Sequence, residues 1–389
     1  MQFARLAKVL VARGHTVFVV DYVDGCLARN IEDSRIRLIP YEDGAAVALP
    51  DDTLAVFQTM TPWSIFPGLR PAAGTRLLFW TCHPFNLVPT VPGLRRLIQT
   101  GPRLGRPMLR WALPSYWSKV RAFLEILRAR RAIVFMDKGN LTNTERYLSV
   151  SIRDGELLPI PVAVNVPNDA PPASARAPLR VAWVGRVVDF KYHILTRAME
   201  RLDSAAAAAN RPVHMTVVGD GDYLPRLERD ARSLRTLEVE FRGKLPPSAV
   251  AGFLSTEVDV LLAMGTAAIE GAALGIPTVL LDFSYQPVAE DYRFTWLHQG
   301  AGYSLGELIG SEHHGAAGSM LGLLNDVWSR FAALSREARD HVARNHAVEP
   351  VCDRFLELAE RSSCRWEHLQ SAGVLQPGWL YRMHKSIRR

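Results

Sequence analysis

The sequence predicts an α/β protein built from two doubly wound, Rossmann-like domains. The chain has 389 residues, whereas an ordinary domain has roughly 100 to 200. Apolar stretches of strand length alternate with segments of helical periodicity in two separate runs. Between the runs lies a stretch rich in Pro, Ala and Asn that shows no periodicity, which is typical of a linker. We therefore expect domains at 1–165 and 180–362, a linker at 166–179 and a basic, aromatic tail at 363–389.

The composition is that of an ordinary globular protein. Hydrophobic residues make up 48% and charged residues 22% of the chain, which excludes collagen-like and wholly disordered proteins. The four cysteines form no CxxC pair, so we expect neither a zinc site nor a disulfide framework, and a reducing cytosol as the compartment. The longest apolar stretch, 258–281, carries Asp259 and Glu270, so no transmembrane span is expected.

Basic residues concentrate in one part of the chain. The formal net charge is +7, yet residues 92–131 hold nine Arg and one Lys against a single acid. Three interpretations stay open: a solvated helical face, nucleic-acid binding, and attachment to an anionic membrane surface. We favour the membrane over nucleic acid, because no RNA-binding signature or zinc finger accompanies the patch. The aromatic residues of the segment would support either: Trp111, Tyr116, Trp117 and Phe123.

The N-terminal half opens with a helix rather than a strand. Helical spacing from Phe3 ends at Gly14, and residues 16–20 are the first apolar stretch of strand length. Because a doubly wound domain ordinarily opens with a strand and a glycine-rich turn, the first strand is expected to be lacking. A start codon placed too far downstream would explain this, and upstream coding sequence without an in-frame apolar strand would refute it. Further strands are expected at 54–57, 76–80, 132–135 and 157–162.

The C-terminal half repeats strand, glycine turn and helix. Strands are expected at 180–184, 214–218, 239–242, 258–262 and 277–282. The turns after the first four contain glycines: Gly185, Gly219, Gly243 and Gly265. Ligands bind at the carboxyl ends of the strands in open parallel sheets, so these turns should meet in one crevice.

Two basic residues and one acid give this crevice its chemistry. Arg186 and Lys191 follow the first strand and are suited to neutralise a diphosphate leaving group. The helix opened by Gly265 and Thr266 offers free N–H groups to a phosphate or sugar. Glu270 lies one turn further along and could accept hydrogen bonds from ribose hydroxyls. The alternative for Glu270 is a surface carboxylate.

The C-terminal half, over about 179–360, carries four ordered motifs: VAWVGRVVDFK, MTVVGDGDYLPRLERDA, VEFRGKLPPSAVAGFLSTEVDVLL and MGTAAIEGAALGIPTVLLD. Together they resemble the retaining GT-B nucleotide-sugar glycosyltransferases of the large group 1, or family-4, type. The resemblance implies two Rossmann-like domains facing a cleft. It implies that Arg186 and Lys191 hold the diphosphate of the donor, that the backbone near Lys244 and Leu245 receives the base, and that Glu270 receives the ribose. Further donor-binding positions are Gly185, Gly219, Gly265 and Thr266.

Two positions depart from the family pattern. The first of its two glutamates would fall at Leu262, and the glycine after its lysine is Tyr192. The first departure bears on sugar recognition and on activity. Residues 220–222 spell the DxD metal signature of another glycosyltransferase fold, but they flank a strand-to-helix turn, so no metal and no other cofactor is expected.

The N-terminal half resembles the family only loosely. His83 follows the strand expected at 76–80, and family members often place a histidine in such a loop, facing the donor sugar. His83 is therefore a candidate catalytic residue, placed with Arg186 and Lys191, that positions the acceptor or bonds the transferred sugar. A loop histidine that caps a turn is the alternative.

The resemblance implies a retaining glycosyltransferase that moves a sugar from a nucleotide diphosphate-sugar to an acceptor held by the N-terminal half. A lipid-linked or cell-envelope glycan is the expected acceptor, as in polysaccharide biosynthesis. The expected location is the cytoplasm, with residues 92–131 as the means of peripheral membrane attachment to the inner face of the cytoplasmic membrane. Two alternatives stay open: an NDP-sugar 2-epimerase on the same fold, and a non-catalytic membrane-associated partner, which the leucine at position 262 suggests.

Overall fold

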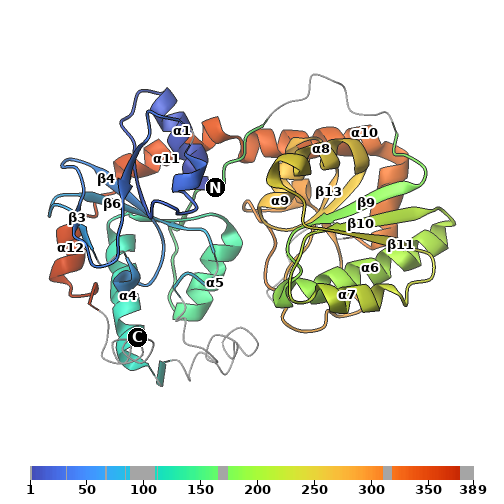
Figure 1. Ribbon diagram of the computed structural model, residues 1–389. Helices are drawn as coiled ribbons and strands as arrows, with labels where there is room; N and C mark the ends of the chain where they lie inside the picture. The colour runs from blue at the N-terminus through green and yellow to red at the C-terminus, as the bar shows by residue number, and fades with distance from the viewer. Residues whose placement is uncertain are drawn as a thin grey trace. The chain divides into compact units, whose positions relative to one another are not determined.

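The computed structural model describes residues 2–31, 33–65, 68–83, 85–87, 110–111, 113–164, 174–309 and 318–376. By packing, the chain forms two compact units (Figure 1). Unit 1 comprises Met1–Pro161 and Val348–Arg389, and unit 2 comprises Val162–Ala347. Residues 348–362, which the sequence placed in the second domain, therefore pack with unit 1. Residues 166–173 of the expected linker and the basic end of the tail, 377–389, lie outside the described residues.

Unit 1 is an α/β unit whose main sheet is parallel, in the order β4-β6-β7-β8. The strands expected at 54–57, 76–80 and 132–135 are confirmed, whereas the one expected at 157–162 is shorter. The elements are α1 (Gln2–Ala12), β1 (Phe18–Asp21), η1 (Ala28–Asn30), β2 (Arg37–Pro40), β3 (Val47–Ala48), β4 (Leu54–Gln58), η2 (Pro62–Ser64), β5 (Leu69–Arg70), β6 (Arg76–Thr81), α4 (Pro114–Ala129), β7 (Ile133–Phe135), α5 (Lys138–Leu148), β8 (Glu156–Leu157), α11 (Val348–Arg361) and α12 (Trp366–Ser371).

The parallel strands of unit 1 fall into separate sheets. β1 pairs only with β2, and β4 pairs only with β6, among the described residues. Helix α1 contacts both sheets: the ring of Phe3 lies 5.4 Å from that of Trp80 in β6, and Ala7 and Val11 share an apolar cluster with Val19 of β1. All residues of β4 are partly exposed, although four of the five are apolar.

Side-chain contacts attach α11 to the rest of unit 1. The guanidinium of Arg13, at the end of α1, forms ion pairs of 2.5 Å with Glu349 and Asp353. At the other end of α11, the guanidinium of Arg76 donates hydrogen bonds to the carbonyls of Ala359, Glu360 and Ser362. Helix C-termini leave carbonyls without intrahelical partners, so Arg76 serves as a cap supplied by β6.

Helix α4 contains the described aromatic residues of the basic segment except Trp111. Tyr116, Trp117 and Phe123 are buried in the core of unit 1, so the expectation that they present a surface for lipid or bases is wrong. Apolar residues at helical spacing pack inward here. Only Trp111 of these four is exposed, at 86%. Residues 92–109 lie outside the described residues. Among the described helices, none is both long enough and apolar enough to cross a membrane.

Unit 2 is built around a six-stranded sheet in the order β11-β10-β9-β12-β13-β14. All of its strands are parallel except β14. Helices α6 and α7 lie on one face and α8 and α9 on the other (Figure 1). The chain therefore reverses its direction of winding between β9 and β12, the point where open sheets bind ligands. The elements are β9 (Leu179–Val184), α6 (Asp189–Ala209), β10 (Val213–Val218), α7 (Leu224–Ala231), β11 (Glu238–Gly243), α8 (Pro247–Glu257), β12 (Val260–Ala263), α9 (Thr266–Ala273), β13 (Thr278–Leu280), β14 (Thr295–Trp296), η3 (Leu297–Gln299) and α10 (Met320–Asn345).

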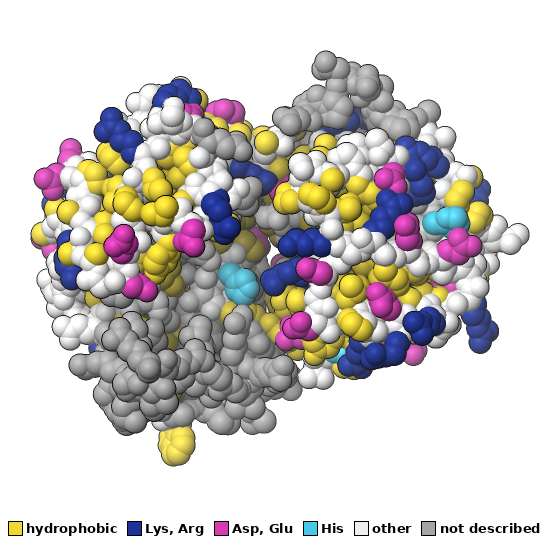
Figure 2. All heavy atoms as spheres, viewed as in Figure 1, with side chains coloured by type: hydrophobic (Ala, Val, Ile, Leu, Met, Phe, Trp, Pro, Cys, Tyr) yellow, Lys and Arg dark blue, Asp and Glu magenta, His cyan; other side chains and the backbone are white. Residues whose placement is uncertain are grey.

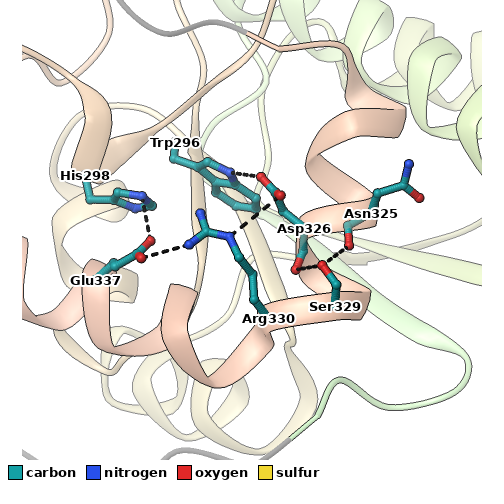
Figure 3. A network of polar contacts seen from close by, with 7 residues as sticks. All are labelled: Trp296, His298, Asn325, Asp326, Ser329, Arg330 and Glu337. Atoms are coloured by element: carbon teal, nitrogen blue, oxygen red, sulfur yellow. Dashed lines mark hydrogen bonds and ion pairs between the residues drawn. The ribbon is translucent and has the colours of Figure 1, made fainter.

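Helix α10 is kinked at Arg330, whose φ of −140° and ψ of 36° are not helical. A polar network surrounds the kink (Figure 3). Glu337 accepts from the guanidinium of Arg330 at 2.8 Å and lies 3.0 Å from Nε2 of His298 in η3. Asp326 lies 3.7 Å from Nε of Arg330. The contact of His298 with Glu337 joins η3 to α10, whereas the two contacts of Arg330 lie within the helix.

Candidate functional site: the glycine turns of unit 2

The turns after β9, β10 and β11 are joined by backbone hydrogen bonds. The amide of Gly185 donates to the carbonyl of Val218 at 2.9 Å, and the amide of Gly219 to that of Gly243 at 2.8 Å. A third bond, of 2.7 Å, runs from the amide of Val187 to the carbonyl of Asp220. The structure thus confirms that the glycine turns meet at the carboxyl ends of these strands.

Gly219 shows why the first two turns need glycine. Its φ is +145°, and a Cβ built on it would lie 2.0 Å from the carbonyl oxygen of Gly185. That separation is far below van der Waals contact, and the atom it meets belongs to the backbone, which cannot move away cheaply. The close approach of the two turns therefore depends on the absence of a side chain.

Lys191 lies in the first turn of α6, directly after β9. Its ammonium lies 5.5 Å from the centre of the Trp183 ring and 5.7 Å from that of Phe190. Burial, together with the charge of Arg186, lowers the pKa of Lys191 from 10.5 to about 8. Arg186 is exposed, and its charge acts on Lys191. The structure thus brings together the two cations expected to hold a diphosphate.

Neither cation has a carboxylate partner among the residues that the structure describes. Elsewhere in unit 2, exposed Arg and Lys side chains occur in small groups separated by acidic and apolar side chains on the face shown in Figure 2. Two cations that repel each other and form no ion pair in the described part of the chain are complementary to a ligand that carries two adjacent negative charges.

The turns after β11 and β12 carry the remaining donor-binding candidates. Lys244 is exposed and Leu245 partly exposed, directly after Gly243. Gly265 caps α9 with a φ of 66° and has no side chain to accept from the first amides of that helix. Thr266 is exposed beside it, and Glu270 is partly exposed, while its helical neighbours Ile269 and Gly271 are buried. The amides at the start of α9 and the Glu270 carboxylate belong to the same short helix.

The loop after β13 closes against the start of α6. The amide of Ser284 donates to the carbonyl of Phe190 at 2.9 Å. The rings of Phe283 and Tyr285 lie 5.8 Å and 6.0 Å from that of Phe190. Phe283 and Tyr285 therefore pack against Phe190 at the start of α6, and Phe190 in turn lies beside Lys191. In the sequence, the only indication of a role for Trp183 and Phe190 is their position eight residues and one residue before Lys191.

The structure gives a physical reason for each departure from the family pattern. Tyr192 points away from the turns, between α6 and α7: its hydroxyl donates to Asp230, and the guanidinium of Arg226 lies 4.6 Å over its ring. A glycine is therefore not needed here. Leu262 is fully buried inside β12, paired with Trp183 of β9. Where the family pattern has a carboxylate, this chain therefore has a leucine that packs in the core.

His83 belongs to unit 1, in the loop after β6. It is exposed, and its Nδ1 accepts a hydrogen bond of 3.2 Å from the amide of Phe85. This is the turn-capping contact that was the alternative interpretation. An accepting Nδ1 places the proton of a neutral ring on Nε2. In the first turn of α5, the main-chain amide of buried Asn140 donates to the Asp137 carboxylate that caps the helix.

No group of three or more His, Cys, Asp or Glu side chains able to hold a metal ion occurs within the described ranges. Asp220 and Asp222 are both exposed. At the turn, the main-chain carbonyl of Asp220 accepts a hydrogen bond from the amide of Val187.

Neither models of protein families nor curated protein sequences match the chain. Solved structures do. A glycosyltransferase from Rickettsia africae ESF-5 is 12% identical with a TM-score of 0.52, over 92% of this chain and 94% of that one. WaaG, a glycosyltransferase involved in lipopolysaccharide biosynthesis, is 16% identical with a TM-score of 0.47, over 92% and 95%. A mutant of S. aureus TarM, in complex with fondaparinux, alpha-GlcNAc-glycerol and UDP, is 16% identical with a TM-score of 0.42.

The likeness to the Rickettsia africae structure extends over nearly the whole of both chains. The match to TarM covers 62% of this chain and spans only 46% of the TarM chain. At these identities the likeness is one of fold. Together with the parallel α/β sheets of both units, it confirms the fold class expected from the sequence: the chain has the GT-B fold.

Proposed function

We propose that the chain is a retaining glycosyltransferase that uses a nucleotide diphosphate-sugar as donor. The observation that carries the proposal is the meeting of Arg186 and Lys191 at the joined glycine turns of unit 2 without a carboxylate partner in the described residues. A diphosphate supplies the two adjacent negative charges that such a site lacks. The first amides of α9 offer further donors to an anion or a sugar oxygen, and Glu270 offers an acceptor for ribose hydroxyls.

In the proposed reaction, the bond between the anomeric carbon and the diphosphate oxygen breaks as an acceptor hydroxyl attacks the same face of the sugar. The hydroxyl proton passes to the departing phosphate oxygen, so the products are a glycoside and a nucleoside diphosphate. Arg186 and Lys191 stabilise the charge that develops on the leaving group. Nε2 of His83 is proposed to donate to the sugar or the acceptor. No protein nucleophile, resident metal or other cofactor is required.

The proposed acceptor is a lipid-linked or cell-envelope glycan, met at the inner face of the cytoplasmic membrane. The support is the run of basic residues at 92–131 and exposed Trp111. Lys and Arg near an anionic surface contribute about 1 kcal/mol each. Co-sedimentation with vesicles of phosphatidylglycerol, compared with phosphatidylcholine vesicles, tests this part separately. Equal binding to both would remove it.

Calorimetric titration with UDP, GDP, ADP and dTDP, and then with nucleotide diphosphate-sugars that carry the same bases, tests the donor site. We expect one nucleoside diphosphate to bind, and Arg186→Gln and Lys191→Gln each to weaken it about tenfold or more. Arg235→Gln is the matched control, since this exposed arginine lies just before β11, at the amino end of the sheet. Undiminished binding in both site variants would show that the phosphates lie elsewhere. The anomeric configuration of the product, read by NMR, tests retention.

One observation favours a second candidate function. Leu262 is a core residue at the place of the first family glutamate, so sugar contacts are fewer than the family pattern implies. A non-catalytic partner would bind membrane without binding any nucleoside diphosphate, which the titration detects. Incubating the donor without acceptor and analysing the sugar distinguishes the 2-epimerase, because only that enzyme would form the 2-epimer.

A further inference from the structure

Trp183 contacts both parts of the cationic site. It is the penultimate residue of β9 and is fully buried, at 0% exposure. Its Nε1 donates a hydrogen bond of 3.0 Å to the carbonyl of Gly185. The same ring lies 5.5 Å from the Lys191 ammonium. One side chain therefore holds the first glycine turn and faces the lysine.

We propose that Trp183 is a positioning residue for the donor diphosphate, because its indole fixes the Lys191 ammonium and the Gly185 carbonyl in one arrangement. The inference rests on the proposed function in one respect: it takes Lys191 as a diphosphate ligand. The contacts of the indole with Lys191 and Gly185 do not depend on that assumption.

An aromatic face suits this task better than a carboxylate. An acid beside Lys191 would also hold the ammonium, but it would neutralise the charge and compete with the phosphate. The face of an indole attracts a cation through its quadrupole and leaves the charge available. Burial and Arg186 both disfavour the ammonium form of Lys191, so the ring opposes both effects.

The bond to Gly185 acts on the neighbouring turn as well. The carbonyl oxygen that accepts from Trp183 is the atom against which Gly219 packs, since a Cβ on Gly219 would lie 2.0 Å from it. A carbonyl fixed by the indole therefore determines how closely the turns after β9 and β10 approach. Both turns belong to the edge where the diphosphate is proposed to bind.

Titration of Lys191 in the ligand-free protein tests the inference without any nucleotide. The chain has only six lysines, so carbon-13 labelling of lysine gives a short spectrum, and Lys191→Met identifies the signal. We expect a midpoint near pH 8 in the natural protein. In Trp183→Leu the midpoint should fall by about half a pH unit or more, the equivalent of a lost cation–π contact.

Trp296→Leu is the matched control. Trp296 is also a fully buried tryptophan of unit 2, and its indole bonds to Asp326 instead. We expect this variant to lose stability without moving the Lys191 midpoint. A folded Trp183→Leu protein that titrates like the natural one would overturn the inference. Should Trp183→Leu not fold, biosynthetic incorporation of 5-fluorotryptophan replaces it, because fluorine weakens the ring quadrupole without removing the ring. We then expect the Lys191 midpoint to fall by a smaller amount. An unchanged midpoint would count against the inference.

Binding of the preferred nucleoside diphosphate provides the second readout. Trp183→Phe keeps a ring but loses the Gly185 bond, so we expect about threefold weaker binding, and about tenfold weaker binding in Trp183→Leu. If the natural protein binds no nucleoside diphosphate, the proposed function fails, whereas the titration still decides whether Trp183 holds Lys191. Unchanged affinity in both variants would overturn the positioning role.

Discussion

Gly219 and Gly185 approach so closely that a single methyl group on Gly219 would lie 2.0 Å from the Gly185 carbonyl oxygen. We therefore expect Gly219→Ala to separate the two turns and to lower the free energy of unfolding by about 2 to 3 kcal/mol, since strain at a positive φ adds to the clash. The Gly219→Ala variant should also lose the binding of a nucleoside diphosphate. Urea denaturation and calorimetry measure the two effects.

Gly252→Ala is the control for that substitution. Gly252 lies within α8, and a Cβ there meets no atom within 4 Å. Alanine is favoured over glycine in a helix by about 1 kcal/mol, so this variant should be more stable than the natural protein and should bind equally well. Equal stability of the two variants would contradict the close approach of the turns.

The affinity for a nucleoside diphosphate should fall as the pH rises above about 8. Lys191 has a pKa lowered to about 8 by burial and by Arg186, and only its protonated form attracts phosphate. Each further pH unit should therefore weaken binding by up to about tenfold. Lys191→Arg, which stays charged, should remove this dependence. Calorimetry between pH 7 and 10 checks the prediction, and a flat profile in the natural protein would contradict it.

The same lysine should lower the stability of the ligand-free protein. Because the folded protein binds the Lys191 proton less tightly than the unfolded chain, the free energy of unfolding should rise with pH between about 8 and 10.5. At pH 7, Lys191→Met should raise it, by an amount on the order of 2 kcal/mol, while abolishing diphosphate binding. Lys244→Met, at an exposed side chain, should change stability by less than about 0.5 kcal/mol.

Acid should destabilise unit 2 through His341 of α10. Burial lowers the pKa of His341 to about 4, and the charges of His346, His298 and Arg344 act in the same direction. The unfolded chain takes up this proton near pH 6.5, so stability is retained above that pH and lost as the pH falls toward 4. His341→Gln should make the decrease in the free energy of unfolding over this pH range smaller by about 2 kcal/mol. Urea denaturation between pH 4 and 7 measures the effect.

Replacing Arg76 should weaken the attachment of α11. Its guanidinium donates to carbonyls at the end of that helix, and hydrogen bonds from charged groups contribute about 1.5 to 3 kcal/mol. We expect Arg76→Met to lower the free energy of unfolding by about that amount and to raise amide exchange in α11. Arg153, exposed and without a partner among the described residues, supplies the control Arg153→Met. Unchanged exchange in α11 would argue against the cap.

The sequence predicted the strands and glycine turns of the site better than the side-chain contacts within it. Strand, glycine turn and helix follow from local patterns, so the convergence of Gly185, Gly219 and Gly243 could be derived from topology. The contacts of Trp183 could not, because periodicity assigns a strand residue to the core but does not show which neighbours it meets. The same limit applies to Tyr116 and Trp117: composition places them in a basic segment, and only their helical phase buries them.

The membership of α11 in unit 1 also could not be derived from its own sequence. Its apolar face fits a partner from either half of the chain. The partners that decide the matter, Arg13 and Arg76, lie more than 280 residues away in sequence. Long-range ion pairs and hydrogen bonds of this kind leave no local pattern.

The separation of β1 from β4 has a consequence for the behaviour of the protein in solution. Within the part of the chain that has been described, each of these strands pairs with another strand along one margin only. Unpaired margins are templates onto which a foreign extended segment can add. Partly exposed Leu, Val and Phe side chains on β4 make that addition more favourable, so we expect the unpaired margin of β4 to be one place where self-association begins.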